Sequence, residues 1–269
     1  MCTIAILYGV AHAPLVVAAN RDEAYARPTR PPERLAPGVA GGVDVLAGGT
    51  WLAVHARGFF AAVTNKSTLD LTAPPFGGAA RQAQVPDRVP QPQGLRSRGL
   101  VVRELASAPD PDAYVAALDP RAYASMNLAW GDARATSVAY LRREDGSKEI
   151  VRLAAGVHVL CNDRLGAPEY LRADRVARAV EPCVAAPWPE LERELERILG
   201  DNTTADPPPS SPLPPDLSRA LTATCIHSPG YGTRSSTIVA IDRDRVRAYR
   251  HADGPPCTTA YVDRMELLA

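Results

Sequence analysis

Short runs of apolar and β-branched residues, separated by tight turns, follow one another along most of the chain. Met1–Tyr8 and Pro14–Ala19 form one such pair, and Trp51–His55 and Phe59–Asn65 form another. In total, about a dozen strands and about four helices are predicted in this way. Strands joined by tight turns pair antiparallel, and the helices fall mainly in two groups after runs of strands. We therefore expect an α+β fold with antiparallel sheets rather than a βαβ repeat.

Three stretches outside these pairs carry predictions of their own. Tyr25–Pro37 is rich in proline and arginine and is not expected to form regular structure. Thr72–Gly94 contains many Pro, Gly and Gln residues, which predicts a long loop of the kind that often serves as a lid or a binding loop. Leu221–His227 is predicted to be a strand.

The overall composition is that of a globular protein. The chain has 269 residues, of which 46% are hydrophobic, and we expect a single domain over residues 1–269. Lys plus Arg and Asp plus Glu both number 30, so no basic excess favours binding to nucleic acid or to an anionic membrane. An apolar run of about 18 residues and a signal-peptide pattern are both missing, which predicts a cytoplasmic protein without an integral membrane segment. The oligomeric state is left open.

The cysteines do not form a recognisable spacing pattern. They are odd in number and include no CxxC pair, so neither a disulfide framework nor a zinc site is expected. No metal is predicted on this basis. The five are Cys2, Cys161, Cys183, Cys225 and Cys257.

The second residue of the chain, Cys2, could be chemically reactive. If the initiator Met1 is removed, Cys2 carries a free α-amino group on the same carbon as its thiol side chain. The pKa of such an amine is about 7.7–8.0, so its neutral form can accept the thiol proton directly or through a water. One residue would then supply both the nucleophile and the base. A lone cysteine near a terminus more often packs as a small apolar residue, so the other features decide between these interpretations.

Further polar residues stand where predicted strands end. Asn20-Arg21-Asp22-Glu23 follows the second strand, and Asn65, Asn162 and Arg234 lie at strand ends or adjoining turns. Rigid strand ends can hold side chains at fixed mutual positions. Asn amides can stabilise an oxyanion or orient the α-amine, a carboxylate can hold that amine, and arginines can lower the thiol pKa or bind a substrate carboxylate. The set matches what attack on an amide by an N-terminal thiol requires.

Several of these motifs, in this order, resemble the NRDE family, the homologues of the transport and Golgi organization protein. The resemblance extends from the first strand to about Ile241 and implies an N-terminal-nucleophile (Ntn) hydrolase fold, a four-layer αββα sandwich of antiparallel sheets. A more distant similarity is to the choloylglycine hydrolase and penicillin V acylase group. The motifs that carry the resemblance are Cys2, Asn20–Glu23, Gly48–Leu52, Ala62–Asn65, Ser97–Gly99, Asn127–Leu128 and Tyr231–Ser236.

The resemblance implies specific roles for individual residues. Cys2 is the expected nucleophile, Arg21 and Asp22 its supports, and Asn65 or Asn162 the oxyanion donor. Arg234 matches the late arginine of the acylase group. The candidate substrate-binding residues are Asn20, Trp51 and Tyr231.

Two functions follow from this comparison, and the residues leave both open. The first is hydrolysis of a non-peptide carbon–nitrogen amide bond through a Cys2 thioester, with a small-molecule substrate and no cofactor. The second is a non-enzymatic carrier of a hydrophobic ligand, such as haem or an acyl-CoA or other lipid, because family members have been linked to Golgi organisation, lipid metabolism and haem trafficking. Besides Cys2, the candidate haem ligands are His12, His55, His158 and His227.

Overall fold

The computed structural model describes residues 2–10, 12–66, 94–168, 170–207 and 213–269. Most of the predicted loop Thr72–Gly94 lies outside these residues; only Gly94, in a turn, is described. Within the described residues, the strands form two seven-stranded antiparallel sheets.

The first sheet has the strand order β10-β1-β2-β12-β13-β14, with the short β11 paired to β12. Its centre is the pair β1 and β2, because β2 contacts β1 on one side and β12 on the other along nearly its whole length. The strands of this sheet are β1 (Cys2–Tyr8), β2 (Leu15–Ala24), β10 (Gly156–Leu160), β11 (His227–Ser228), β12 (Tyr231–Ile241), β13 (Val246–Ala252) and β14 (Val262–Asp263).

The second sheet is a meander in which each strand pairs with the next along the chain. Two helices follow its first four strands, and its last three come after them. The strands are β3 (Thr29–Ala36), β4 (Val39–Asp44), β5 (Leu52–His55), β6 (Phe59–Asn65), β7 (Met126–Gly131), β8 (Thr136–Arg142) and β9 (Ser147–Arg152), and the two helices are α1 (Arg98–Ala106) and α2 (Pro111–Ala117).

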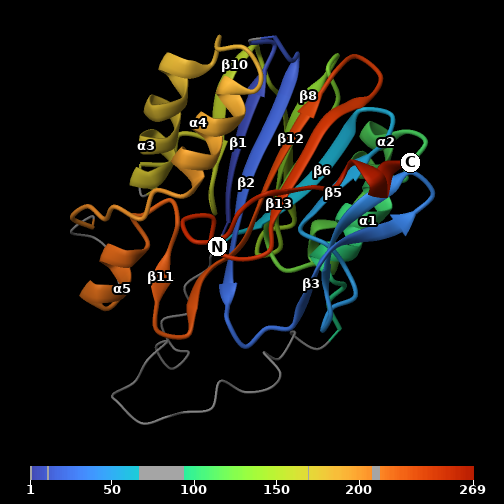
Figure 1. Ribbon diagram of the computed structural model, residues 1–269. Coiled ribbons are helices and arrows are strands. Elements are labelled where there is room, and N and C mark those ends of the chain that lie inside the picture. The colour runs from blue at the N-terminus through green and yellow to red at the C-terminus, as the bar shows by residue number, and fades with distance from the viewer. Residues whose placement is uncertain (1, 11, 67–93, 169, 208–212) are drawn as a thin grey trace.

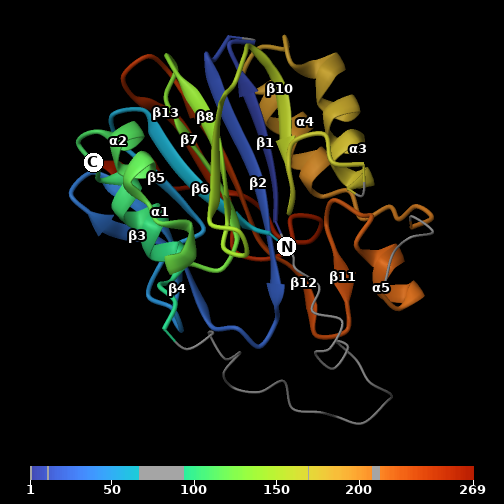
Figure 2. The ribbon, with the colours of Figure 1, turned by 180° about the vertical axis from the view of Figure 1, so that it is seen from behind.

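The two sheets pack face to face, with helices on both outer faces (Figures 1 and 2). Alternate residues of β1 separate two cores. Ile4 and Ile6 face the core between the sheets, whereas Ala5 and Leu7 face the core under α3 (Leu171–Val180) and α4 (Glu190–Leu199). A third core joins the second sheet to α1 and α2. The predicted α+β fold with an αββα layer order is therefore confirmed.

Two predictions of local structure were wrong. Tyr25–Pro37 is not irregular throughout, because Thr29–Ala36 forms β3. This strand lies at the edge of its sheet, and its register shifts between Arg30 and Glu33, on either side of Pro31 and Pro32. An edge strand with a bulge can accept prolines, which lack the N–H that a central strand needs.

Leu221–His227 is also not a strand over its predicted length. A short helix, α5 (Pro215–Ala220), precedes it, and only His227 and Ser228 pair with β12. Backbone hydrogen bonds hold the segment between them, from the Cys225 N–H to the Asp201 carbonyl and from the Thr233 N–H to the Ile226 carbonyl. The apolar residues here are buried by docking onto β12 and the end of α4 rather than by sheet formation.

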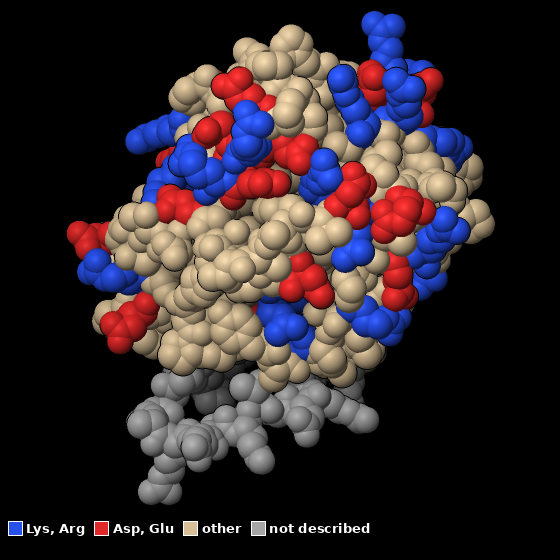
Figure 3. Space-filling view, viewed as in Figure 1, with Lys and Arg blue, Asp and Glu red and all other residues tan. Residues whose placement is uncertain are grey.

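The described surface mixes charges of both signs. On the face shown in Figure 3, Lys and Arg side chains alternate with Asp and Glu side chains. Among the residues that the structure describes, no helix combines the length and the apolar character needed to cross a membrane.

Candidate active site

Cys2 begins β1 and lies directly opposite Arg21 on β2. Both residues share the side of the sheet that Ile4 and Ile6 occupy, because strand side chains alternate between faces. The Cys2 thiol and the Arg21 guanidinium therefore lie between the two sheets. They are at the strand end where the chain begins, which carries the label N in Figure 1. The residues Asn20–Glu23 do not follow the second strand, as the sequence suggested, but are part of β2.

The second sheet supplies an aromatic surface for Arg21. The Arg21 guanidinium carbon lies 4.4 Å from the centre of the Trp51 ring, a distance typical of a cation–π contact. Gly42 makes room for this ring, since a Cβ atom at position 42 would come within 2.2 Å of it. The glycine-rich stretch of β4 therefore positions Trp51 over Arg21.

Arg21 also belongs to a cluster of acidic and basic side chains. Arg21 Nη2 lies 3.9 Å from a carboxylate oxygen of Glu23 and 3.9 Å from one of Asp44. Arg27 pairs with the same Asp44 oxygen at 2.7 Å. Arg21 is only 5% exposed, and its Nη1 has no hydrogen-bond partner within the described part of the chain. A buried donor without a partner is costly, so this atom is a candidate for binding a ligand oxygen.

Asp22 points to the opposite face of the sheet, toward the α3 layer. One carboxylate oxygen accepts a hydrogen bond of 2.7 Å from the Thr233 hydroxyl on β12. The other lies 3.2 Å from Nη1 of Arg172 on α3, and both partners of this ion pair are almost fully buried. The backbone of Asp22 nevertheless adjoins Cys2, so the paired strands place the Cys2 thiol on one face and a buried carboxylate on the other.

The two predicted asparagines are linked to this ion pair. Arg172 Nη2 donates to Oδ1 of Asn162 at 3.3 Å, and Nδ2 of Asn162 donates to the Asn65 carbonyl at 2.7 Å. Asn162 follows β10 in the first sheet and Asn65 ends β6 in the second. The structure therefore connects Asp22, Asn162 and Asn65 through one arginine that the sequence analysis did not single out.

A second set of hydrogen bonds ties the sheets together beside these asparagines. The Thr64 hydroxyl donates to the Cys161 carbonyl at 2.5 Å, and Nδ2 of Asn127 donates to the Thr64 hydroxyl at 2.9 Å and to the Asp163 carbonyl at 3.2 Å. Asn127 is fully buried. Buried polar groups that are paired in this way fix the relative position of the strands that carry them.

The environment changes the proton affinities at the site. Burial raises the pKa of the Cys2 thiol, and the nearby Asp22 carboxylate raises it further, whereas Arg21 and a hydrogen bond to the Asp22 backbone lower it. Burial also raises the pKa of Asp22, against the opposing charge of Arg172 and the Thr233 hydrogen bond. A thiol in this environment needs a nearby base in order to react at neutral pH.

The remaining predicted residues occupy different positions. Tyr231 begins β12 and pairs with Ala24 of β2, two residues beyond Asp22. Burial raises the pKa of its phenol, and the charges of Asp22 and Cys2 raise it further. Arg234 donates to the Tyr25 carbonyl at 2.7 Å and contacts the Thr29 hydroxyl at 3.4 Å, so its described bonds join β12 to the start of β3.

The Asn20 side chain links β2 to two other segments of the chain. Its Nδ2 donates to the carbonyls of Leu199 and Thr224, each at 2.9 Å, and the residue is 1% exposed. These bonds connect β2 to the end of α4 and to the segment after α5. The side chain thus faces the helix layer, as Asp22 does, and not the space between the sheets where Cys2 lies.

Sequence reasoning missed two arginines. Arg172 lies on α3, a helix with several arginines and no motif of the resemblance, and it is 1% exposed. Arg98, the first residue of α1, belongs to a motif of the resemblance. Burial and the charge of Arg27 lower its pKa, while the charges of Glu23 and Cys2 raise it, so Arg98 lies near Cys2. The signal for Arg98 was present in the Ser97-Arg98-Gly99 motif.

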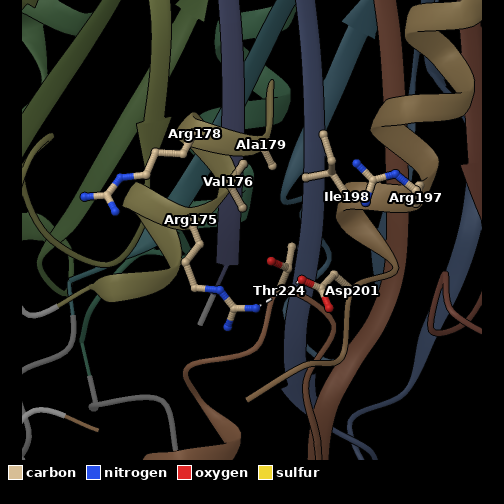
Figure 4. Close-up of a pocket in the computed structure, with 8 residues that line it drawn as sticks. All are labelled: Arg175, Val176, Arg178, Ala179, Arg197, Ile198, Asp201 and Thr224. Atoms are coloured by element: carbon tan, nitrogen blue, oxygen red, sulfur yellow. Dashed lines mark hydrogen bonds and ion pairs between the residues drawn. The ribbon is translucent and has the colours of Figure 1, made fainter. Parts of the chain in front are cut away.

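A hollow of about 340 Å³ lies between α3 and α4 (Figure 4). Arg175 and Asp201 pair across it at 3.1 Å. Its lining includes neither Cys2 nor another residue predicted for the site, so it is separate from the candidate active site. The lining residues are Arg175, Val176, Arg178, Ala179, Arg197, Ile198, Asp201 and Thr224.

The chain is similar to three mammalian proteins, each with a name that begins "Transport and Golgi organization". The bovine protein 2 homolog is 30% identical over 254 residues, which cover 86% of this chain and 83% of that protein. The human protein 2 homolog is 29% identical, with the same coverage of 86% and 83%. The mouse 2 homolog is 28% identical, with coverage of 85% and 82%.

One solved structure similar to this chain is that of the Caenorhabditis elegans ortholog of N-acylethanolamine-hydrolyzing acid amidase. It aligns with a TM-score of 0.47 and 9% identity, over 89% of this chain and 92% of that one. The family described as Transport and Golgi organisation 2 matches residues 1–250. By this match and by its mammalian relatives, the chain belongs to the Transport and Golgi organisation 2 family.

Proposed function

We propose that the protein is an N-terminal-cysteine hydrolase that cleaves a non-peptide carbon–nitrogen amide bond. The observation that carries this proposal is the position of Cys2. It begins a central strand, lies opposite Arg21 and adjoins the backbone of the buried Asp22. A cysteine that served only in packing would not need these charged neighbours.

In the proposed reaction, removal of Met1 first frees the α-amine of Cys2. The amine takes the proton of the thiol, and Sγ attacks the acyl carbonyl carbon to form a carbon–sulfur bond. The protonated amine then gives its proton to the leaving nitrogen as the carbon–nitrogen bond breaks. A water, deprotonated by the same amine, then attacks the thioester carbonyl carbon and the carbon–sulfur bond breaks. The released thiolate takes the proton back from the amine, which frees the carboxylic acid and restores Cys2. No cofactor enters this sequence.

The neighbouring residues support this assignment in different ways. Asp22 is a positioning residue that would hold the protonated α-amine, and the Arg172 ion pair fixes its carboxylate. Asn162 already donates to the Asn65 carbonyl. We therefore assign the developing oxyanion to the side-chain amide of Asn65, which ends β6 on the second sheet.

The arginines suggest the class of substrate. Arg21 Nη1 has no described partner, and Arg98 lies close to Cys2 with a pKa lowered mainly by burial. Two cations beside the nucleophile favour a substrate that carries a carboxylate or phosphate near its scissile amide. Trp51 and Tyr231 supply aromatic surface for its apolar part.

The experiment combines mass spectrometry with a substrate panel. Intact mass should show that Met1 is absent, and a panel of N-acyl amides should include acyl groups with and without a second anionic group. Hydrolysis should be lost in Cys2→Ala and retained in Cys183→Ser, which changes a thiol outside the site. Retention of Met1 in active protein would exclude the amine as base. A Soret band on haem titration that is lost in a Cys2 or His variant, without amide hydrolysis, would favour a carrier.

A further inference from the structure

Three potential metal ligands converge at a place the proposed reaction does not use. Cys225 Sγ, His227 Nε2 and Cys257 Sγ all lie within 4.8 Å of one another. The Cys225 sulfur is 3.5 Å from the Cys257 sulfur and 3.7 Å from the His227 nitrogen, and the Cys257 sulfur is 3.1 Å from that nitrogen. Cys225 and Cys257 are 32 positions apart in the chain, so their spacing gives no zinc-binding signature.

The three distances match one face of a metal-centred tetrahedron. Zinc binds thiolate sulfur at about 2.3 Å and imidazole nitrogen at about 2.0–2.1 Å in tetrahedral geometry. Ideal tetrahedral angles then place two sulfurs about 3.8 Å apart and a sulfur and a nitrogen about 3.5 Å apart. The observed separations lie within a few tenths of an ångström of these values, so a cation could bind without a large movement of the backbone.

The scaffold holds the ligands independently of any metal. The Cys225 N–H donates to the Asp201 carbonyl at 2.9 Å, at the end of α4. Cys257 lies in a turn in which the N–H groups of Thr258 and Thr259 donate to the Pro255 carbonyl. A Cβ atom at Gly200 would lie 3.4 Å from the Cys257 backbone nitrogen, so this turn packs against the same helix end. Both cysteines are therefore positioned by α4.

The donor set indicates the class of cation. Two thiolates and one imidazole suit a soft or borderline d¹⁰ ion, whereas Mg²⁺ and Ca²⁺ prefer oxygen ligands. Cys225 is buried, Cys257 is half-buried and His227 is exposed. A cation held by these three would thus keep its fourth position toward the solvent side of His227.

We propose that Cys225, His227 and Cys257 form a binding site for a thiophilic divalent cation, with Zn²⁺ the expected occupant and one position open to water or an external ligand. The site lies close to the buried carboxylate of Asp22 along the chain of hydrogen bonds. The Ile226 N–H donates to the Thr233 hydroxyl at 2.8 Å, and that hydroxyl donates to Asp22. The proposal does not depend on the hydrolase function.

The test is metal binding by the full-length reduced protein. After treatment with a chelator, the protein is titrated with Zn²⁺ in competition with a chromogenic chelator, and the metal content is measured by mass spectrometry. We expect about one equivalent per chain. Cys257→Ser and His227→Ala should weaken binding by about 100-fold or more, since even loss of an outer hydrogen-bond partner of a ligand costs 10–100-fold.

Two control variants distinguish this site from other thiols. Cys183→Ser and Cys2→Ala remove half-buried cysteines that lie outside the three, and both should still bind one equivalent. Co²⁺ should give a thiolate charge-transfer band in wild type that is lost in Cys257→Ser. Unchanged binding in Cys257→Ser and His227→Ala would overturn the proposal. So would a Cys225–Cys257 disulfide that persists in reductant, because it would consume both thiolates.

Discussion

Cys2 and Arg21 face each other across the β1–β2 pair, and Arg21 is held in place from the other sheet by the Trp51 ring. Cys2 and Arg21 therefore both belong to the first sheet, whereas the aromatic ring that packs against Arg21 belongs to Trp51 and comes from the second sheet. A long flexible arginine becomes a fixed charge in this arrangement, because packing removes most of its alternative rotamers. Its effect on the thiol is consequently open to direct measurement.

Removing the Arg21 charge should slow the alkylation of Cys2. Arg21 lowers the pKa of the Cys2 thiol, so Arg21→Met raises that pKa and reduces the thiolate fraction at a fixed pH below it. A rise of one unit reduces the thiolate about tenfold, and we expect a decrease in rate of about threefold to tenfold at pH 8. The rate is measured by iodoacetamide labelling with peptide mapping, which separates Cys2 from the other cysteines.

The matched control for this measurement is Trp51→Phe, which keeps an aromatic face under an intact arginine. Its alkylation profile should follow that of wild type within about twofold, since the stacking partner of Arg21 remains. Equal rates for Arg21→Met and wild type across pH 6–9 would mean that the guanidinium does not influence the sulfur.

Loss of Arg172 should destabilise the protein through Asp22. Arg172→Met leaves the Asp22 carboxylate buried without the cation that faces it, and breaking a buried pair from one side costs about 3–5 kcal/mol. The double variant Asp22→Asn/Arg172→Met should recover part of this loss. Arg197→Met, which removes a pair with Glu194 from a side chain that is 64% exposed, should cost less than about 1 kcal/mol. Urea unfolding measures all three.

The cost of Arg172→Met should also depend on pH. Burial already raises the pKa of Asp22, and without the opposing charge of Arg172 it rises further. The folded variant then binds a proton more readily than its unfolded chain, so its stability relative to wild type should increase as the pH falls from 8 toward 5. The double variant has no carboxylate at position 22 and should lack this trend. A constant difference between Arg172→Met and wild type would show that Asp22 stays ionised.

Much of the site could be predicted from short motifs. Cys2, Arg21 and Trp51 each lie in a short motif that the sequence analysis identified. The structure brings these three residues together between the sheets. The antiparallel sheets followed from the hairpin pattern, whereas the four-layer order was implied by the resemblance. Local patterns report such features because each depends on residues that are neighbours along one strand or turn.

Other parts depend on contacts between distant segments and could not be predicted. Arg172 appears on a helix with several arginines, and only the packing of α3 against the first sheet shows that this one is buried beside Asp22. Cys225 and Cys257 meet because two loops dock on the end of α4. The prolines of β3 suggested irregular structure, since the sequence does not show that this strand lies at a sheet edge. In each case the outcome depends on tertiary contacts between segments that are far apart in the sequence.

The paired glycines before Trp51 should respond very differently to substitution. Gly49 crosses the start of α1 so closely that a Cβ atom would lie 2.2 Å from the Gly99 carbonyl carbon, whereas a Cβ atom at Gly48 meets no atom within 4 Å. Gly48→Ala carries only the cost of a positive φ of 69°, about 1–2 kcal/mol. Gly49→Ala must displace backbone and should cost about 3 kcal/mol. Thermal and urea unfolding of the two variants give the comparison, and equal losses would contradict the close approach.

His251 should make the protein sensitive to mild acid. It lies on β13 beside Thr237, its Nδ1 is 2.9 Å from the Thr237 hydroxyl, and burial together with the charge of Arg264 lowers its pKa to about 3. The unfolded chain binds a proton near the ordinary value of 6.5, so the contribution of neutral His251 is complete above that pH and is lost as the pH falls toward 3. Each unit of pH across this window costs up to about 1.4 kcal/mol. His251→Gln should therefore lose stability less steeply between pH 6.5 and 4.5 than wild type. Identical slopes for wild type and His251→Gln would show that the imidazole charges inside the folded protein.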